Sequence, residues 1–366
     1  MDTTGRKSFL LFGYLGGRNL GDDAMLSGFF SAAPEKTDFV VLARDKDEVK
    51  IPTNRTVKVL AANFFEAMKQ IIRSDGVIRV GGTSFHDEYK IKSNLRMKCN
   101  YAKLMFMYLL PWLLRKKIAA IGIGAGTPLH WWTKFTATLS FRACRLIIAR
   151  DRASARILNN LTGGHNVLAG VDLAFLDERD LCNRTMPGVI GVSVLDLSPF
   201  MTIGYGSQLD FWEEVIKRTA ERSAGKELRI FAFKDNDSES DLIIAKELER
   251  RMGGLFDQVS VVGYADGLER ILNDMSACDT FVATRYHSAI FASLMGMKMV
   301  IVPYNEKLLH LVDDLAISPE AVIDLGHWSR TQELGAFEPT YVNPARANDL
   351  PVRVSDMRHA IAKFFA

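Results

Sequence analysis

The feature that most constrains the fold is a regular alternation of short apolar, β-branched runs with longer amphipathic ones, punctuated by Gly, Asp or Ser. Such alternation is typical of strand–helix–strand units, whose crossover helices pack on a parallel sheet. The first half predicts enough strands for one doubly wound α/β sheet, with helices such as 22–32, 64–73 and 151–161. Those strands are residues 8–12, 38–42, 57–61, 76–80, 118–123 and 145–149.

The pattern restarts after residues 176–187, a polar, charged segment that ends in Pro-Gly and is typical of an interdomain crossing. The 366 residues also fit about two domains. We therefore predict an N-terminal domain over 1–180, a C-terminal domain over 185–340, and a tail over 341–366. The tail carries a helix that begins at Ser355 and could pack back on the N-terminal domain. Strands are predicted at 189–194, 228–233, 259–262, 280–283 and 298–302, and helices at 208–223, 238–252, 266–276, 289–295 and 307–315.

Composition excludes several classes of protein. A hydrophobic fraction of 48% with 24% charged residues excludes global disorder. Lys+Arg 46 against Asp+Glu 43 gives a net charge of +3, too balanced for a protein whose main task is to bind nucleic acid backbones. Any basic site must be local. The scattered cysteines, without metal-binding spacing, are interpreted as reduced packing residues. They are Cys99, Cys144, Cys182 and Cys278.

The N-terminus has only a short apolar run that breaks into glycines, so a cytoplasmic location is expected. The longest apolar stretch, 104–114, is too short to span a membrane. With the basic residues 115–117 and Trp131-Trp132-Lys134, it could form an interfacial helix on anionic lipid. A buried core helix is the alternative, and Pro111 complicates both.

Three glycine-rich segments follow predicted strands of the first half. The first contains Gly16, Gly17, Asn19 and Gly21 and opens a helix whose N–H groups could meet an anion or a hydroxyl-rich ligand. Asp22 could cap that helix or act in catalysis, whereas Asp23 is interpreted as a cap. In the second, Gly81-Gly82 precedes His86, which titrates near neutral pH but could equally be a solvated loop residue. The third is the turn with Gly122, Gly124 and Gly126.

Charged residues follow two further strands. Arg150 could aim its guanidinium at a phosphate or carboxylate, or it could form a structural pair with Asp151. Arg285, His287 and Ser288 follow the strand at 280–283, and Tyr304 and Lys307 follow the next one. Two cations, a helix N-terminus and a histidine indicate a site for an anionic substrate with a proton-transfer group.

No metal cluster stands out in the sequence. Asp235, Asp237 and Asp241 lie in a loop and an early helix turn, where we expect solvation and capping to explain them. Activity is therefore predicted to need neither a metal nor a cofactor.

These motifs together resemble the polysaccharide pyruvyl transferase family. Its G-Y-x-G-x-x-N-x-G-D segment stands here from Gly13 to Asp22. Its R-x-H-x-x-x-F-A block runs from Arg285 to Ala292, and its Y-x-x-K is Tyr304 to Lys307. Two departures are Thr83, where the family often has a third glycine, and Leu195, where it often has arginine.

The resemblance implies two Rossmann-like domains facing a cleft, as in glycosyltransferases of the B type. It also implies transfer of pyruvate from phosphoenolpyruvate to a sugar diol of a polysaccharide or lipid-linked precursor, giving a ketal and phosphate. His287 is the first choice for the acid, with His86 or Asp22 as base, and Arg285 completes the catalytic candidates. The residues expected to bind substrate are Gly16, Gly17, Asn19, Gly21, Gly82, Gly124, Arg150, Ser288, Tyr304 and Lys307.

Two other functions fit the same architecture. A nucleotide-sugar glycosyltransferase would be stabilised by a uridine or guanosine diphosphate sugar and not by phosphoenolpyruvate. A non-catalytic glycan-binding protein would keep affinity for sugar without turnover.

Overall fold

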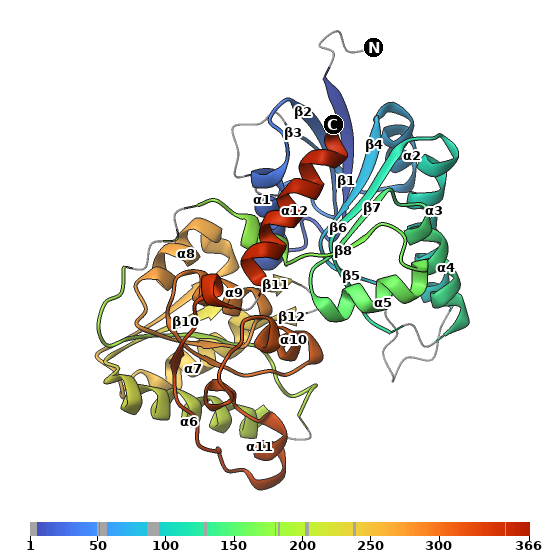
Figure 1. Ribbon diagram of the computed structural model, residues 1–366. Coiled ribbons are helices and arrows are strands. Elements are labelled where there is room, and N and C mark those ends of the chain that lie inside the picture. Colours follow the sequence, from blue (N-terminus) through green and yellow to red (C-terminus); the bar gives the residue numbers. More distant parts are fainter. Residues whose placement is uncertain are drawn as a thin grey trace. The chain divides into compact units, whose positions relative to one another are not determined.

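A computed structural model of the protein (Figure 1) describes residues 6–49, 51, 57–85, 95–127, 130–179, 181, 184–201, 205–236, 239–347 and 349–366. The chain divides into two compact units. The first contains Met1–Gly17, Asp22–Glu178 and Val352–Ala366, and the second contains Arg18–Gly21 and Arg179–Pro351. The sequence-based division differs in three places: residues 18–21, residues 179–180 and residues 341–351 belong with the second unit.

The first unit is built on a parallel sheet in the order β3-β2-β1-β4-β6-β7-β8, with the two-residue β5 paired to β6. Its inner strands are largely buried, apolar runs, as expected where helices cover both faces of a parallel sheet, whereas the edge strands β3 and β8 contain no buried residue. The strands are β1 Lys7–Phe12, β2 Thr37–Ala43, β3 Val57–Ala61, β4 Gly76–Val80, β5 Thr83–Ser84, β6 Lys117–Ala125, β7 Leu146–Ala149 and β8 Val167–Ala169.

Helices cover both faces of this sheet (Figure 1). One face packs on the inner sides of α2, α3, α4 and α5 through a single apolar cluster. The other face packs on α1 and α12, where aromatic rings meet edge to face. The helices are α1 Leu20–Ala32, α2 Phe64–Arg73, α3 Leu95–Leu113, α4 Trp131–Arg142, α5 Arg152–Thr162, the short 3-10 helix η1 Leu173–Leu176, and α12 Leu350–Phe365.

The C-terminal helix joins the first unit through its last turn. The Phe365 ring lies 4.9 Å from that of Phe9 on β1 and 5.9 Å from that of Phe39 on the neighbouring strand β2. The helix begins earlier than the predicted Ser355. Pro351 lies in its first turn, where a residue without an N–H group is tolerated, so proline starts the helix instead of stopping it.

The second unit is a smaller sheet in the order β13-β10-β9-β14-β15-β16, parallel except for β16. A separate two-stranded hairpin pairs β11 with β12. The strands are β9 Val189–Ser193, β10 Glu227–Ala232, β11 Asp235–Asn236, β12 Glu239–Ser240, β13 Gln258–Gly263, β14 Thr280–Ala283, β15 Lys298–Ile301 and β16 Thr340–Tyr341.

Helices also enclose the second sheet. Trp212 of α6 and Trp328 of α11 are buried in the cluster that covers one face, together with the inner side of α7. The helices are α6 Tyr205–Ser223, α7 Asp241–Met252, α8 Leu268–Ser276, α9 Tyr286–Leu294, α10 Glu306–Asp314 and α11 Leu325–Thr331, with 3-10 helices η2 Tyr264–Asp266, η3 Pro319–Ala321 and η4 Pro344–Arg346.

The strand order in each unit reverses at one point, between β1 and β4 in the first and between β9 and β14 in the second. In open α/β sheets ligands bind beyond the carboxyl ends of the strands at such a reversal. The fold therefore places the strongest candidate positions directly after β1 and β4 and directly after β9 and β14.

The cysteines divide by burial. Cys144 and Cys278 are buried, and burial raises the pKa of both thiols, so they pack as small apolar residues. Cys99 is exposed on α3, so its predicted role in packing is wrong. Cys182 lies outside the described residues.

Replacing Phe365 with Ala is expected to lower the free energy of unfolding of the first unit by about 3 kcal/mol, because it leaves a cavity among packed aromatic rings. Chemical denaturation followed by circular dichroism measures this. Val352→Ala is the matched control, since Val352 is an exposed residue of the same helix and its loss should cost under about 0.5 kcal/mol. Equal effects of the two changes would contradict the role given to the last turn.

Candidate functional site

The turn between β14 and α9 is held by two buried serines. The Ser193 hydroxyl, at the end of β9, accepts hydrogen bonds from the backbone N–H groups of Thr284 at 2.9 Å and Arg285 at 3.4 Å. It also lies 2.7 Å from the Ser288 hydroxyl, which donates to the Arg285 carbonyl. The turn thus has a defined shape at the point where the strand order reverses.

Arg285 is fixed by a buried carboxylate. Its Nε donates to Asp241 Oδ2 at 2.9 Å, and Nη2 pairs with Oδ1, which makes the contact bidentate. Asp241 is fully buried at the start of α7, and its Oδ2 also accepts the Lys234 backbone N–H at 3.0 Å. The sequence-based expectation that solvation and capping explain Asp241 is therefore wrong. The Asp241 carboxylate neutralises and orients Arg285.

Residues 18–21 belong to the second unit because they pair with the segment that follows β10. Leu20 donates its N–H to the Phe233 carbonyl at 3.1 Å, and Asp235 donates to the Arg18 carbonyl at 3.2 Å. Asn19 forms a β-bridge with Lys234 between them. The Arg18 guanidinium also pairs with Asp235 at 3.0 Å, so Asp235 is an ion-pair partner and not simply a solvated residue. Asp237 lies outside the described residues.

This pairing brings the first glycine motif to the histidine of the last one. Asn19 accepts the Gly21 N–H at 3.2 Å through its side-chain oxygen, which shapes the turn into α1. A methyl group on Gly21 would overlap the His287 imidazole, with Nδ1 and Cε1 the nearest atoms. Gly21 is therefore required for close approach of the backbone to His287.

His287 is the second residue of α9 and is half-buried. Its ring packs edge to face on Tyr286 at 5.3 Å between centroids, and its Nε2 atom is buried. The helix begins at Tyr286, and its N-cap residue Arg285 makes no side-chain capping hydrogen bond. The positive end of α9 and the imidazole thus lie at one place, an arrangement suited to an anion and a proton transfer.

Tyr304 and Lys307 follow β15, the neighbour of β14. The Tyr304 ring packs on Phe200 at 4.7 Å between centroids and is half-buried. Asn305 caps α10 by accepting the Leu308 N–H at 3.2 Å, which places the exposed Lys307 in the first turn. Contact of Tyr304 and Lys307 with substrate stays a prediction.

Two residues of the second unit that the sequence analysis singled out are fully buried. Ser288 is fully buried and is bonded to Ser193 and to the Arg285 carbonyl, so it helps to shape the turn, and its contact with substrate stays a prediction. Leu195, where the family often has arginine, is also fully buried in the apolar cluster. That position supplies no cation.

The glycines of the first unit pack against protein. Gly16 has φ +68°, and a methyl group there would overlap the Asp45 carbonyl oxygen. A methyl group on Gly17 would lie 2.6 Å from the Tyr14 ring. These close contacts within the protein are enough to require glycine at both positions. The predicted binding of substrate by Gly16 and Gly17 is not needed to explain why they are glycines.

Arg150 shows the structural alternative that the sequence left open. It is buried, and its Nε pairs with Asp151 at 3.3 Å, while Asp151 caps α5 by accepting the Ser154 N–H. A methyl group on Gly124 would lie 2.7 Å from Arg150 Nε, so this glycine makes room for the guanidinium. Gly82, with φ +76°, accepts the Gly124 N–H at 2.9 Å. Contact of Arg150 and Gly124 with substrate stays a prediction.

The two candidates for the catalytic base are Asp22 and His86. Asp22 is buried in the first turn of α1, and its role as cap or base stays a prediction. His86 lies outside the described residues. Within the described ranges, no group of three or more His, Cys, Asp and Glu side chains could hold a metal ion.

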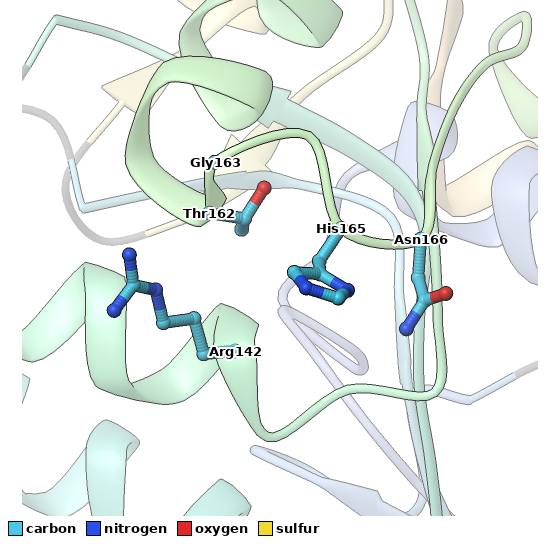
Figure 2. A pocket seen from close by; sticks show the side chains of 5 residues that line it. All are labelled: Arg142, Thr162, Gly163, His165 and Asn166. Carbon is cyan, nitrogen blue, oxygen red and sulfur yellow. The ribbon is translucent and has the colours of Figure 1, made fainter.

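A surface pocket in the first unit lies beyond the end of α5 (Figure 2). Two of its polar side chains are bonded to backbone: Thr162 donates to the Leu158 carbonyl at 2.9 Å and Asn166 to the Cys144 carbonyl at 3.5 Å. No predicted site residue lines it. The lining residues are Arg142, Thr162, Gly163, His165 and Asn166.

Sequence reasoning missed the partners that position the site. Asp241 was seen but interpreted as a cap, because a single aspartate at a helix start is usually one. Ser193 belongs to a segment that follows the family order, but nothing in the sequence indicated that its hydroxyl shapes the turn after β14. Residues at the carboxyl ends of the two strands where the strand order reverses lie at one site. With the strand order known, this rule would have placed Ser193 beside the turn after β14.

The fold is that of glycosyltransferases of the B type, so the predicted fold class is confirmed. A putative UDP-N-acetylglucosamine 2-epimerase from Listeria monocytogenes matches with 10% identity over 99% of this chain and 91% of that chain, TM-score 0.53. A glycosyltransferase from Rickettsia africae matches with 10% identity over 99% and 95%, TM-score 0.50. At this identity the likeness concerns the fold alone.

The chain belongs to the polysaccharide pyruvyl transferase family, whose model matches residues 19–306. The match begins at Asn19 and includes both Gly21 and the turn with Arg285 and His287. The family assignment from the motifs is therefore confirmed, and with it a transferase that acts on a glycan.

Gly21→Ala is expected to displace the His287 ring, because the added methyl group overlaps it. The expected result is a shifted His287 imidazole resonance in NMR and a lower melting temperature. Gly206→Ala is the matched control, since a methyl group there meets nothing within 4 Å and should leave both unchanged or raise stability slightly. An unmoved His287 resonance in Gly21→Ala would contradict the close approach.

Asp241→Asn is expected to destabilise the second unit by about 3–5 kcal/mol, because it leaves the Arg285 guanidinium without its buried counter-charge. Asp235→Asn breaks the more exposed pair with Arg18 and should cost about 1 kcal/mol or less. Denaturant unfolding of both variants measures the difference. If Asp241→Asn lowers the free energy of unfolding no more than Asp235→Asn does, the stabilising role of the buried pair is refuted.

Proposed function

We propose that the protein transfers pyruvate from phosphoenolpyruvate to a sugar diol of a polysaccharide or lipid-linked glycan precursor, forming a ketal and releasing phosphate. The observation that carries the proposal is the Arg285–His287 turn, matched by the family model and packed against Gly21. No metal or cofactor takes part in the proposed reaction.

The proposed chemistry needs one acid, one base and cationic contacts. Protonation of the enol methylene gives a methyl group and an oxocarbenium-like centre at the neighbouring carbon. One sugar hydroxyl attacks that carbon, phosphate leaves, and the second hydroxyl closes the ketal. Of the two hydroxyl protons, one replaces the proton given to the methyl group and the other leaves with phosphate. Each transfer suits a side chain that titrates near neutral pH.

We assign the acid to His287, because its imidazole lies at the N-terminus of α9. That helix end and Lys307, in the first turn of α10, are proposed to bind the phosphate or carboxylate of phosphoenolpyruvate. The Asp241 carboxylate neutralises the charge of Arg285, so we propose that Arg285 chiefly orients the turn and the substrate. Asp22 or His86 is proposed as base.

The test is release of inorganic phosphate from phosphoenolpyruvate with a panel of lipid-linked or synthetic glycans. His287→Asn is expected to lower kcat by about 10²–10⁴-fold, because an amide cannot transfer the proton. His359→Asn, at an exposed position of α12, is the control and should keep the rate. Full activity in His287→Asn, or no phosphate release with any acceptor, would overturn the proposal. Chelation of metals should leave the rate unchanged.

Thermal stabilisation separates the proposal from its two alternatives. Phosphoenolpyruvate at about 100 times its Kd should stabilise the protein by about 2.7 kcal/mol, and nucleotide diphosphate sugars should not. Stabilisation by such a sugar alone would favour a nucleotide-sugar glycosyltransferase. Affinity for a glycan without turnover of any donor would favour a non-catalytic binding protein.

A further inference from the structure

The outer sides of α2, α3 and α4 carry an exposed apolar surface, which we call the α2–α4 surface. More than half of the large hydrophobic side chains that are exposed in the described part of the chain lie on it or directly after α3. Phe65 is 82% exposed, Leu95 77% and Trp131 72%. Its members are Phe64, Phe65, Ile72, Leu95, Trp112, Leu113, Leu114, Trp131 and Phe135.

Helix α3 presents a regular apolar stripe to this surface. Tyr108 and Pro111 are the buried residues on its inner side. On the opposite side, apolar residues recur at alternating spacings of four and three, which keeps them on one helical face. They are Leu95, Cys99, Ala102, Phe106, Leu109 and Leu113, and none of them is buried.

The three helices form one continuous surface, because they pack side by side on the same face of the sheet (Figure 1). The Phe64 ring of α2 lies 5.4 Å from the Phe106 ring of α3. Trp132 of α4 donates its indole N–H to the Lys98 carbonyl of α3 at 3.2 Å and stacks on Phe135.

The charge of the segment that contains α3 and α4 has one sign. From residue 89 to residue 150 the sequence contains twelve Lys and Arg residues and no Asp or Glu, although the whole chain has 43 acidic residues. Basic side chains exposed on or next to α3 and α4 include Arg96, Lys103, Arg115 and Lys134. On α2, by contrast, Glu66 pairs with Lys69.

Two basic residues predicted to face lipid are used elsewhere. Lys116 donates to the carbonyls of Ile72 and Ser74 at the end of α2, and Lys117 donates to the Phe364 carbonyl at the end of α12. They satisfy helix ends in the first unit. The charge available to a partner therefore comes from the exposed residues of α3 and α4.

We propose that the α2–α4 surface docks on an anionic phospholipid membrane without crossing it. Exposed Trp, Phe and Leu beside Lys and Arg are the composition of an interfacial membrane contact, and the single sign of charge on α3 and α4 complements anionic headgroups. A second copy of the chain fits less well, because a symmetric pairing of these helices would bring like charges together. No helix in the described ranges is long and apolar enough to span a bilayer.

This membrane contact goes beyond pyruvyl transfer and does not depend on it. The purified full chain is sedimented with vesicles of phosphatidylglycerol and phosphatidylethanolamine, and separately with phosphatidylcholine vesicles. Binding is expected on the anionic vesicles only, and it should fall several-fold between about 50 mM and about 500 mM salt.

Two double variants test the two components of the contact. Lys103→Glu with Lys134→Glu should weaken vesicle binding by about 25-fold or more, since each basic residue near an anionic surface contributes about fivefold. Leu113→Gln with Trp131→Gln should weaken it by about tenfold or more. The control, Leu255→Gln with Lys246→Glu, changes an exposed apolar residue and an exposed lysine of the second unit and should bind as wild type.

Circular dichroism shows that each variant is folded, and phosphate release with a water-soluble acceptor reports the proposed reaction separately. Unchanged phosphate release with lost vesicle binding supports the proposal. Equal vesicle binding by all variants, or none by the wild type, overturns it. Sedimentation velocity tests the alternative partner. If the wild type forms a dimer and does not bind vesicles, and if Leu113→Gln with Trp131→Gln dissociates that dimer, the membrane proposal is overturned and the surface is assigned to a second copy.

Discussion

The candidate site depends on the buried pair of Arg285 and Asp241. A guanidinium taken out of water needs a counter-charge in good geometry, and Asp241 supplies it bidentately while also accepting the Lys234 N–H. That carboxylate links the start of α7, the chain after β10 and the turn after β14. Because Lys234 in turn bridges to Asn19, the same connection holds the glycine motif against His287.

The glycine motifs of the two units have different physical origins. In the first unit, Gly16, Gly17 and Gly124 are required by the Asp45 backbone, the Tyr14 ring and the Arg150 guanidinium. In the second unit, Gly21 is required by an imidazole at a helix N-terminus. A glycine-rich segment after a strand therefore indicates close packing, and only the identity of the neighbour tells whether chemistry is involved.

Much of the fold could be predicted, because β-strand–α-helix alternation is written in local periodicity. The predicted strands of both sheets fall close to the observed ones, but β8 and β16 were not predicted, and the start of α12 and the exposure of Cys99 were predicted wrongly. Pro351 resembles a break until its place in a first turn is known, and a cysteine resembles a packing residue until its helical face is known. Burial of Arg150 and Ser288 likewise depends on contacts between distant segments.

By itself, the sequence determined the fold class, the family, and the two residue types that define the site, an arginine and a histidine after one strand. It also determined the acid-free run from residue 89 to 150. Only the tertiary structure decided which glycine meets His287, which carboxylate neutralises Arg285, and which lysines are used at helix ends. These are contacts between residues far apart in the chain, and no local pattern records the order in which the strands lie in a sheet.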